Sequence, residues 1–197
     1  GDNIMRKIGV FGGSFDPVHN GHIETAQQAV DEFGLDFVIF IPSYLPPHKL
    51  RLQASSQDRL NMLSLAVKNN GKFLIDTFEI QNKRIVYSFE TLDYLQKKYY
   101  KDILKLIIGS DTFNQLDEWE KPEYIAEKYG FLVMKRPDIV LDLDSKYRKY
   151  AVFSEFFMKN ISSTKIRDMI KNNAADIEKL VPEEVLKYIK EKNLYGK

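Results

Sequence analysis

Residues 7–22 read KIGVFGGSFDPVHNGH and join an apolar run to a helical pattern through a glycine-rich turn. Lys7 to Phe11 is short, apolar and partly β-branched, as in a buried strand. From His22 to Phe33 the apolar residues recur at helical spacing. A strand that leads through such a turn directly into a helix predicts the first unit of a parallel α/β sheet.

The same alternation continues along the chain. The further segments expected are strands at 37–41, 73–75, 103–108 and 131–134, and helices at 57–69 and 88–99. Strands and helices that alternate in units of about 35 residues place helices on both faces of a parallel sheet. We therefore predict a Rossmann-like, doubly wound α/β fold, which binds ligands at the carboxyl ends of its strands.

The length of 197 residues fits a single domain. Two more helical patterns, at 164–172 and 183–192, follow Ser162. We expect this C-terminal helical part, about residues 162–197, to pack on the same core. Gly1 to Ile4 are interpreted as the remnant of a removed tag or as an N-terminal extension, with the natural start at or slightly before Met5.

Composition narrows the class of partner. The 29 basic and 28 acidic residues leave a formal net charge of +1, which argues against a nucleic-acid polymer but not against a small anionic ligand. The chain has no cysteine, which excludes disulfides and thiolate chemistry. No apolar run is long enough to span a membrane and no signal peptide is visible, so we expect a cytoplasmic protein without a membrane partner. The oligomeric state stays open, a homo-oligomer included.

The first turn carries the chemistry of a phosphate site. Gly12 and Gly13 permit a close approach of the backbone to a ligand and a positive φ. His19 and His22 lie where the following helix starts, and the N–H groups at a helix start favour anions. Each histidine alone could be an ordinary surface or capping residue. A metal site is the other alternative, but no third ligand at a suitable spacing completes it.

A second candidate phosphate segment runs from Ile161 to Arg167 and reads ISSTKIR. Its serines and threonine offer N-cap hydroxyls at the start of a helix. Arg167 follows about one helical turn later and can fork onto phosphate oxygens. The alternative is an ordinary capped surface helix.

GGSFDPVHNGH resembles the first signature of the nucleotidyltransferase superfamily, whose hallmark is His-x-Gly-His, and ISSTKIR resembles its second signature. The two segments lie in the family order, about 140 residues apart. The resemblance implies that His19 and His22 contact the triphosphate of ATP. The full set of ATP-binding residues it implies is Gly12, Gly13, Ser14, Phe15, His19, His22, Gly109, Asp111, Ile161, Ser162, Ser163, Thr164 and Arg167.

Other segments resemble the bacterial nicotinate-mononucleotide adenylyltransferases in particular. Residues 46–49 read PPHK, like the loop that delivers a lysine in that family; alone, Lys49 would be an ordinary loop lysine. Tyr87 and Ser88 belong to a stretch similar to the family's Ser-Tyr-Thr-x-Asp-Thr, from which it departs at three positions. Trp119, the single tryptophan, stands where the family stacks an indole on the pyridine ring; the alternative is an aromatic lid on the core.

The resemblance implies transfer of the adenylyl group of ATP to nicotinate mononucleotide, with Mg²⁺ bound to ATP rather than to a protein metal site. It implies His19, His22, Lys49 and Arg167 as catalytic residues, and Lys49, Tyr87, Ser88 and Trp119 as contacts of the mononucleotide. Two alternatives remain at this point. One is adenylyl transfer to another phosphorylated acceptor such as phosphopantetheine. The other is a non-catalytic module that senses a nucleotide.

Overall fold

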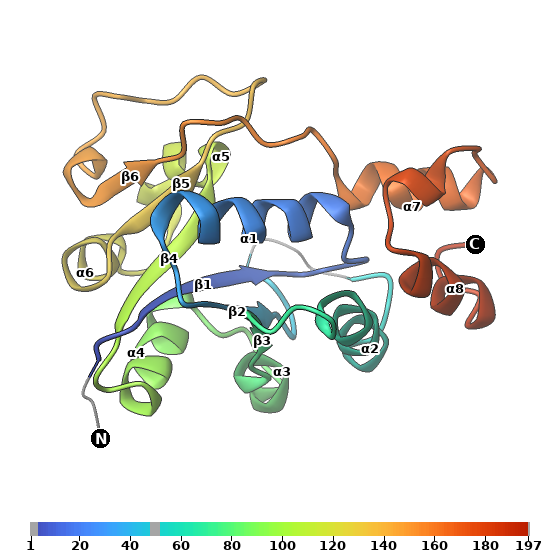
Figure 1. The fold of residues 1–197 in the computed structure, drawn as a ribbon, viewed down its shortest axis with the longest axis horizontal. Coiled ribbons are helices and arrows are strands. Elements are labelled where there is room, and N and C mark those ends of the chain that lie inside the picture. The colour runs from blue at the N-terminus through green and yellow to red at the C-terminus, as the bar shows by residue number, and fades with distance from the viewer. Residues whose placement is uncertain (1–3, 48–51, 197) are drawn as a thin grey trace.

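The computed structural model describes residues 4–47 and 52–196 (Figure 1). Within that part of the chain the strands are β1 (Lys7–Gly13), β2 (Phe37–Pro42), β3 (Phe73–Ile75), β4 (Ile103–Gly109), β5 (Phe131–Met134) and β6 (Ala151–Phe153). The helices are α1 (Asn20–Phe33), α2 (Ser56–Val67), α3 (Phe78–Asn82), α4 (Ser88–Lys98), α5 (Ser110–Asn114), α6 (Pro122–Lys128), α7 (Ser163–Lys171) and α8 (Glu183–Glu191). Short 3₁₀ turns lie at Leu116–Glu118, Arg148–Tyr150 and Ile177–Lys179.

The strands form one six-stranded sheet in the order β3-β2-β1-β4-β5-β6, and every pair of neighbours is parallel. The chain builds one half of the sheet outward from β1 and then returns to start the other half at β4. The strand order therefore reverses between β1 and β4, and such a switch point is where doubly wound sheets bind ligands. The predicted Rossmann-like fold is confirmed.

Two apolar cores cover the two faces of the sheet, because successive residues of a buried strand point to opposite sides. In β2, Val38 and Phe40 pack into the core beneath α1 and α2, whereas Ile39 and Ile41 pack into the core beneath α4 and α6. Figure 1 shows α1 and α4 on opposite sides of the sheet. A strand buried on both faces reads as a continuous apolar run, which is why FVIFI was recognisable.

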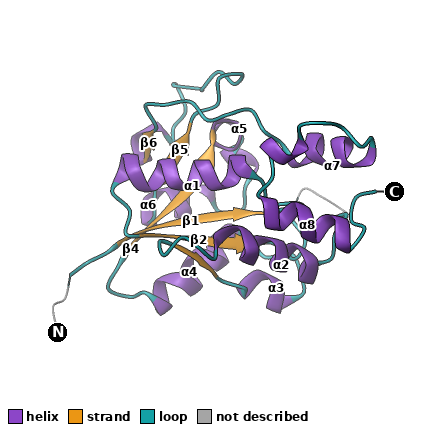
Figure 2. Ribbon diagram, turned by 45° about the vertical axis from the view of Figure 1, so that its right-hand side comes forward, coloured by secondary structure: helices purple, strands orange, loops and turns teal. Residues whose placement is uncertain are grey.

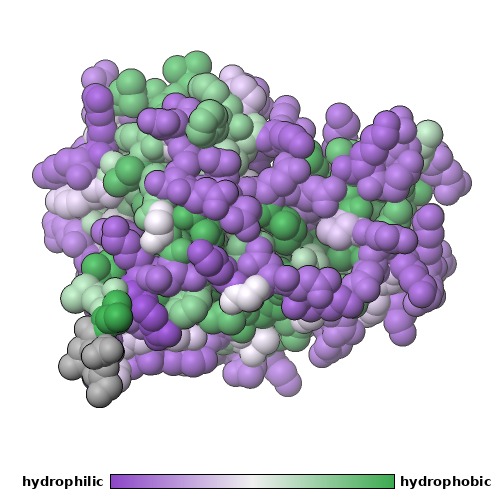
Figure 3. All heavy atoms as spheres, in the orientation of Figure 1, coloured by the Kyte–Doolittle hydropathy of each residue, from purple (hydrophilic) through white to green (hydrophobic). Residues whose placement is uncertain are grey.

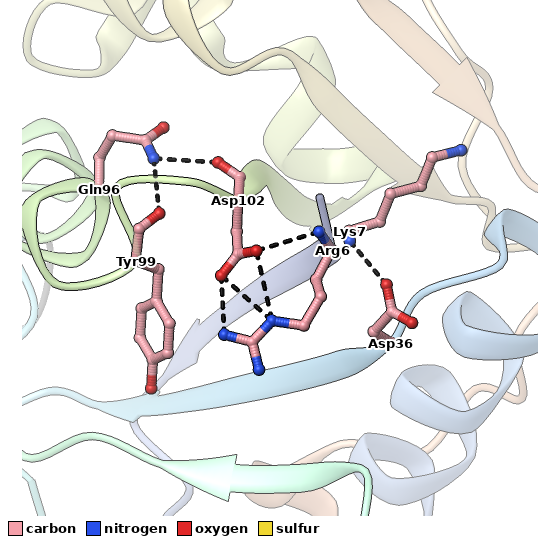
Figure 4. Close-up of polar contacts among 6 residues, drawn as sticks. All are labelled: Arg6, Lys7, Asp36, Gln96, Tyr99 and Asp102. Carbon is pink, nitrogen blue, oxygen red and sulfur yellow. Dashed lines mark hydrogen bonds and ion pairs between the residues drawn. The ribbon is translucent and has the colours of Figure 1, made fainter. Parts of the chain in front are cut away.

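Polar contacts at the amino edge of the sheet tie the starts of neighbouring strands together (Figure 4). Asp102, just before β4, accepts hydrogen bonds from the backbone N–H of Arg6 at 3.0 Å and from its Nη2 at 2.9 Å. Asp36, just before β2, accepts one from the backbone N–H of Lys7 at 2.8 Å. One ion pair and hydrogen bonds from two backbone N–H groups thus tie the strands together at the amino edge, opposite the carboxyl edge where doubly wound sheets bind ligands.

The C-terminal helices α7 and α8 lie beyond the carboxyl end of β1, on the side where the chain ends (Figures 1 and 2). Ile166, Val185 and Ile189 are buried in the same core as α1 and α2. This shared core supports the prediction that residues 162–197 belong to one domain with the rest. Hydrophilic residues cover most of the face drawn in Figure 3. None of the described helices is long and apolar enough to cross a membrane.

The segments that the sequence did not predict are all short. The edge strand β6 has three residues, α3 and α5 have five each, and α6 has seven. A period of two or of 3.6 residues cannot be recognised in so few positions. These segments owe their structure to packing against the sheet rather than to their own pattern.

Candidate active site

A pocket of about 550 Å³ opens at the carboxyl ends of β1 and β4. Eleven of the predicted site residues line it: Gly12, Gly13, Ser14, His19, His22, Tyr87, Ser88, Gly109, Asp111, Trp119 and Ile161. The pocket therefore brings together segments from both halves of the sheet, at the switch point that the fold defines. Lys49 lies outside the described residues.

The first turn departs from the expected backbone. β1 continues through Gly12 and Gly13, and neither glycine has a positive φ; the left-handed residue of the turn is Phe15, with φ 50°. Gly13 is needed for another reason, because a Cβ there would lie 3.2 Å from the ring of Phe15. The Phe15 ring is buried and meets the ring of His22 edge-on at 4.9 Å. Phe15 thus supports the site from behind rather than lining the pocket.

The two histidines cap α1, which begins at Asn20, two residues earlier than expected. The backbone N–H of His19 donates to Nδ1 of His22 at 3.1 Å, and the backbone N–H of His22 donates to Nδ1 of His19 at 3.4 Å. The rings stack with centroids 3.7 Å apart. Because each Nδ1 accepts a hydrogen bond, we infer that the proton of each neutral ring is on Nε2. The capping arrangement therefore leaves the Nε2–H group of each ring as a hydrogen-bond donor near the helix start.

Burial, together with the charge of Arg136, lowers the pKa of His19 to about 4. His19 is 2% exposed, so its charged form loses most of its hydration. The ring is consequently neutral at pH 7 when no anion is bound. A polyphosphate beside it would favour the charged form and raise this pKa.

This lowered pKa predicts how stability depends on pH. Between pH 4 and the ordinary value of about 6.5 the unfolded chain binds the proton and the folded chain does not, so stability falls on acidification. The loss through His19 between pH 7 and pH 5 is about 2 kcal/mol. Denaturant unfolding at the two pH values measures it. His19→Asn, which keeps a capping acceptor but cannot titrate, is expected to lose about 2 kcal/mol less than the unmodified protein over the same range.

Glu79 does not disturb this comparison. Burial raises the pKa of Glu79 to about 7, so this group acts in the opposite direction, but it acts equally in both proteins. Equal losses of stability in the two proteins would contradict the assignment of a buried neutral His19.

The second predicted phosphate segment adjoins the first. Ser162 caps α7 by accepting a hydrogen bond from the backbone N–H of Lys165 at 3.1 Å. Ser163 donates its hydroxyl to the backbone carbonyl of Pro17 at 2.9 Å, and Arg167 donates from Nη1 to the carbonyl of Asp16 at 2.9 Å. The starts of α1 and α7 are thus joined, although Ser162, Ser163, Thr164 and Arg167 stand outside the pocket lining.

The end of β4 brings Gly109 and Asp111 to the pocket. Gly109 caps α5, and a Cβ there would lie 2.9 Å from a carboxylate oxygen of Asp111. Ser110 is fully buried, and its hydroxyl accepts a hydrogen bond from the backbone N–H of Arg136 at 2.9 Å. The serine therefore fastens the end of β4 to the residues that follow β5, while Asp111 stays at the pocket.

Aromatic and helix-start groups form the other end of the pocket. Tyr87 caps α4, and its backbone N–H donates to the carboxylate of Glu90 at 2.9 Å. Glu90 thus stabilises the start of α4 and also pairs with Arg84 at 2.9 Å. Trp119 packs against the core under α4 and α6 and lines the pocket as well. The indole therefore covers the core and also faces the pocket, while its contact with a pyridine ring stays a prediction.

Sequence reasoning left several polar pocket residues without a role in the site, among them Arg136, Glu79 and Ser43. Arg136 lines the pocket two residues after the end of β5. The rule that ligands bind at the carboxyl ends of strands could have identified it. Glu79 from α3 and Ser43 after β2 also line the pocket, and the Ser43 hydroxyl is buried without a hydrogen-bond partner among the described residues. No local pattern marks either residue.

A doubly wound sheet with paired imidazoles and two helix starts at its switch point is typical of a protein that binds a nucleoside triphosphate. Residues 10–169 match the family model described as cytidylyltransferase-like. A protein of Bacillus subtilis (strain 168) named nicotinate-nucleotide adenylyltransferase is 35% identical over 192 residues, which cover 97% of this chain and 99% of the relative. One of Endomicrobium trichonymphae, named probable nicotinate-nucleotide adenylyltransferase, is 38% identical over 97% of this chain and 100% of its own length.

The chain belongs to the cytidylyltransferase-like family and, within it, to the nicotinate-nucleotide adenylyltransferases. A solved structure shares the fold: the nicotinic acid mononucleotide adenylyltransferase of Plasmodium falciparum, complexed with NaAD, superposes with a TM-score of 0.82. The two sequences are 19% identical, and the superposition covers 96% of this chain and 97% of the Plasmodium chain. The resemblance inferred from the two signatures is confirmed.

Proposed function

We propose that the protein transfers the adenylyl group of ATP to nicotinate mononucleotide, giving nicotinate adenine dinucleotide and pyrophosphate. One observation carries this proposal: His19, His22 and Trp119 line the same pocket. One end of this pocket is suited to phosphate groups, and the other end is suited to a mononucleotide with an aromatic ring and a carboxylate. Relatives at 35% and 38% identity that carry this activity in their names support the same acceptor.

The reaction needs positioned donors more than a base. An oxygen of the mononucleotide 5′-phosphate attacks the α-phosphorus of ATP, the new P–O bond forms, and the bond to the β-phosphate oxygen breaks so that pyrophosphate leaves. The attacking phosphate has a second pKa of about 6 and is largely dianionic at pH 7, so it has no proton to lose. Catalysis then consists of holding two polyanions in line and stabilising the charge on the leaving group.

The proposed roles follow from where the described donors lie and, for Lys49, from the family resemblance alone. Nε2–H of His19 and of His22 donate to the α- and β-phosphate region, and Lys49 is proposed to add a cation there. Ser162, Ser163, Thr164 and Arg167 are proposed to hold the departing pyrophosphate. Gly12, Gly13, Ser14 and Ile161 form the wall against which the triphosphate lies, Phe15 supports that wall, and Gly109 with Asp111 receives the ribose.

ATP-dependent nucleotidyltransferases generally use a divalent metal, and we propose Mg²⁺. Among the described residues no three His, Asp or Glu side chains form a group that could hold a metal ion. Phosphate oxygens and water are the ligands that Mg²⁺ prefers, so the ion is proposed to arrive with ATP. Its contribution is to neutralise part of the phosphate charge.

The acceptor end rests on Tyr87, Ser88 and Trp119. Backbone N–H groups at the start of α4, an eleven-residue helix, favour an anion such as the nicotinate carboxylate. The indole of Trp119 supplies a flat apolar surface for the pyridine ring.

Replacing Trp119 with alanine is expected to raise the KM for nicotinate mononucleotide about tenfold, because stacking area is lost. The KM for ATP should change less than twofold. Steady-state kinetics with each substrate varied in turn measure both values. Trp119→Phe keeps an aromatic face and is the matched control, expected to recover most of the affinity. A selective loss of ATP affinity in Trp119→Ala would show that the indole serves the other substrate.

A further inference from the structure

Tyr195, near the C-terminal end of the chain, is buried behind the turn that carries the catalytic histidines. Its side chain is 8% exposed, and its hydroxyl donates to Oδ1 of Asp16 at 2.6 Å. Asp16 is itself 3% exposed and precedes His19 by three residues. Figures 1 and 2 place the C-terminal end on the side where β1 ends. The last turn of the chain therefore reaches the first turn.

The carboxylate of Asp16 is fully engaged inside the protein. Besides Tyr195, it accepts hydrogen bonds from the backbone N–H groups of Gln53 at 2.9 Å and Ala54 at 3.1 Å. It does not line the pocket. Asp16 thus belongs to the support of the turn and is not available as a ligand of a metal on the phosphates.

The carbonyls of the turn are held from the same rear side. Arg59, which is 1% exposed, donates from Nη1 to the carbonyl of Ser14 at 2.7 Å. Arg167 and Ser163 hold the carbonyls of Asp16 and Pro17, each at 2.9 Å. Side chains from α2, from α7 and from the C-terminal end therefore fix consecutive parts of one turn.

Backbone strain explains why so much support is present. Phe15 in the turn has φ 50° and Tyr195 itself has φ 64°, which is a costly conformation for a bulky side chain. Such residues persist only where their surroundings determine the conformation. The hydrogen bond between Tyr195 and Asp16 joins the two strained segments.

We infer that Tyr195 is a positioning residue for adenylyl transfer, which holds Asp16 and thereby fixes the turn that presents the His19 imidazole to the phosphates. The inference rests on the proposed function. Burial and the neighbouring carboxylate of Asp16 raise the pKa of Tyr195, so the hydroxyl stays protonated and donates throughout the working range of pH. Without the Tyr195 hydroxyl, the buried carboxylate of Asp16 keeps hydrogen bonds from backbone N–H groups alone.

The test compares two tyrosines of the C-terminal part. Tyr195→Phe removes only the hydroxyl and is expected to lower kcat/KM for ATP about tenfold, since small displacements of a donor are costly in catalysis. Tyr188→Phe is the matched control. The Tyr188 hydroxyl also donates to a carboxylate at 2.6 Å, that of Asp58, and its hydrogen-bond partners among the described residues, Asp58 and Asn61, lie on α2 and not in the turn. Tyr188→Phe is expected to keep kcat/KM within about twofold of the unmodified protein.

Equal effects of the two substitutions, or no effect of Tyr195→Phe, would overturn the inference. Assays are run well below the unfolding midpoint of the less stable variant, so that loss of folded protein does not enter the rates. A double-mutant cycle with Asp16→Asn adds a second readout. If Tyr195 acts through Asp16, Tyr195→Phe lowers kcat/KM much less in the Asp16→Asn variant than in the unmodified protein. Additive effects of the two substitutions on kcat/KM would contradict that route.

ATP affinity, measured by calorimetry without an acceptor, separates this inference from the proposed function. Tyr195→Phe is expected to weaken ATP binding about fivefold and Tyr188→Phe to leave it unchanged, whichever acceptor the enzyme uses. An unmodified protein that binds ATP but does not react with nicotinate mononucleotide would refute the proposed acceptor and leave this comparison intact. Unchanged ATP affinity and unchanged turnover in Tyr195→Phe would refute only the positioning role.

Discussion

Replacing His22 with alanine is expected to lower kcat by about two orders of magnitude or more while the protein stays folded. The substitution removes one of the two Nε2–H donors proposed to stabilise charge on the phosphates. It also removes the Nδ1 acceptor of the His19 backbone N–H, at 3.1 Å, so the remaining imidazole loses part of its support. Pyrophosphate release under saturating ATP and acceptor measures the effect.

The matched control for this substitution lies farther along the same helix. Asp31 is exposed near the end of α1 and does not line the pocket, and within the part of the chain that the structure describes its side chain accepts a hydrogen bond only from Gln27. Asp31→Ala is expected to retain full turnover. Circular dichroism shows whether each variant keeps its helices. Full turnover in a folded His22→Ala protein would remove the central catalytic assignment.

Gly21→Ala is expected to lower kcat/KM at least about tenfold without removing any functional group. A Cβ at Gly21 would lie 2.7 Å from Cε1 and 2.9 Å from Nδ1 of His19, and 3.2 Å from Cβ of Ile161. The His19 ring, which is packed on its other side against His22 at 3.7 Å, therefore has to shift. Alanine is favoured over glycine inside a helix, so a loss of activity cannot be ascribed to a weaker α1.

Gly71→Ala is the control for Gly21→Ala, because a Cβ at Gly71 meets nothing within 4 Å. It is expected to leave kcat/KM unchanged. Steady-state kinetics of both variants, with thermal unfolding as the check on folding, measure the difference. An unaffected Gly21→Ala enzyme would show that the position of the His19 ring is not critical.

The doubly wound parallel sheet and the place of the pocket were predictable, because they follow from the alternation of apolar strands and helical patterns along the chain. Strands such as β2 are buried on both faces and read as unbroken apolar runs. In a doubly wound sheet the carboxyl ends of the central strands meet at one switch point, so the segments after β1 and β4 had to lie together. His19 and Asp111 therefore line one pocket.

The contacts behind the pocket were not predictable from sequence. Arg59, Asp16 and Tyr195 are far apart in the chain, and no periodicity relates them. Their meeting depends on how α2 and the C-terminal end pack against the turn, which only the assembled fold determines. For the same reason the positive φ was expected at the glycines and was found at Phe15. Local preference favours glycine there, but tertiary packing of the Phe15 ring decides the conformation.

Pyrophosphate release from ATP and Mg²⁺, with nicotinate mononucleotide, nicotinamide mononucleotide and phosphopantetheine offered in parallel, tests the central claim most directly. Adenylyl transfer to nicotinate mononucleotide predicts strong turnover with that acceptor, formation of nicotinate adenine dinucleotide, and little turnover with phosphopantetheine. Turnover with phosphopantetheine alone, or with none of the three acceptors, would contradict the proposed function.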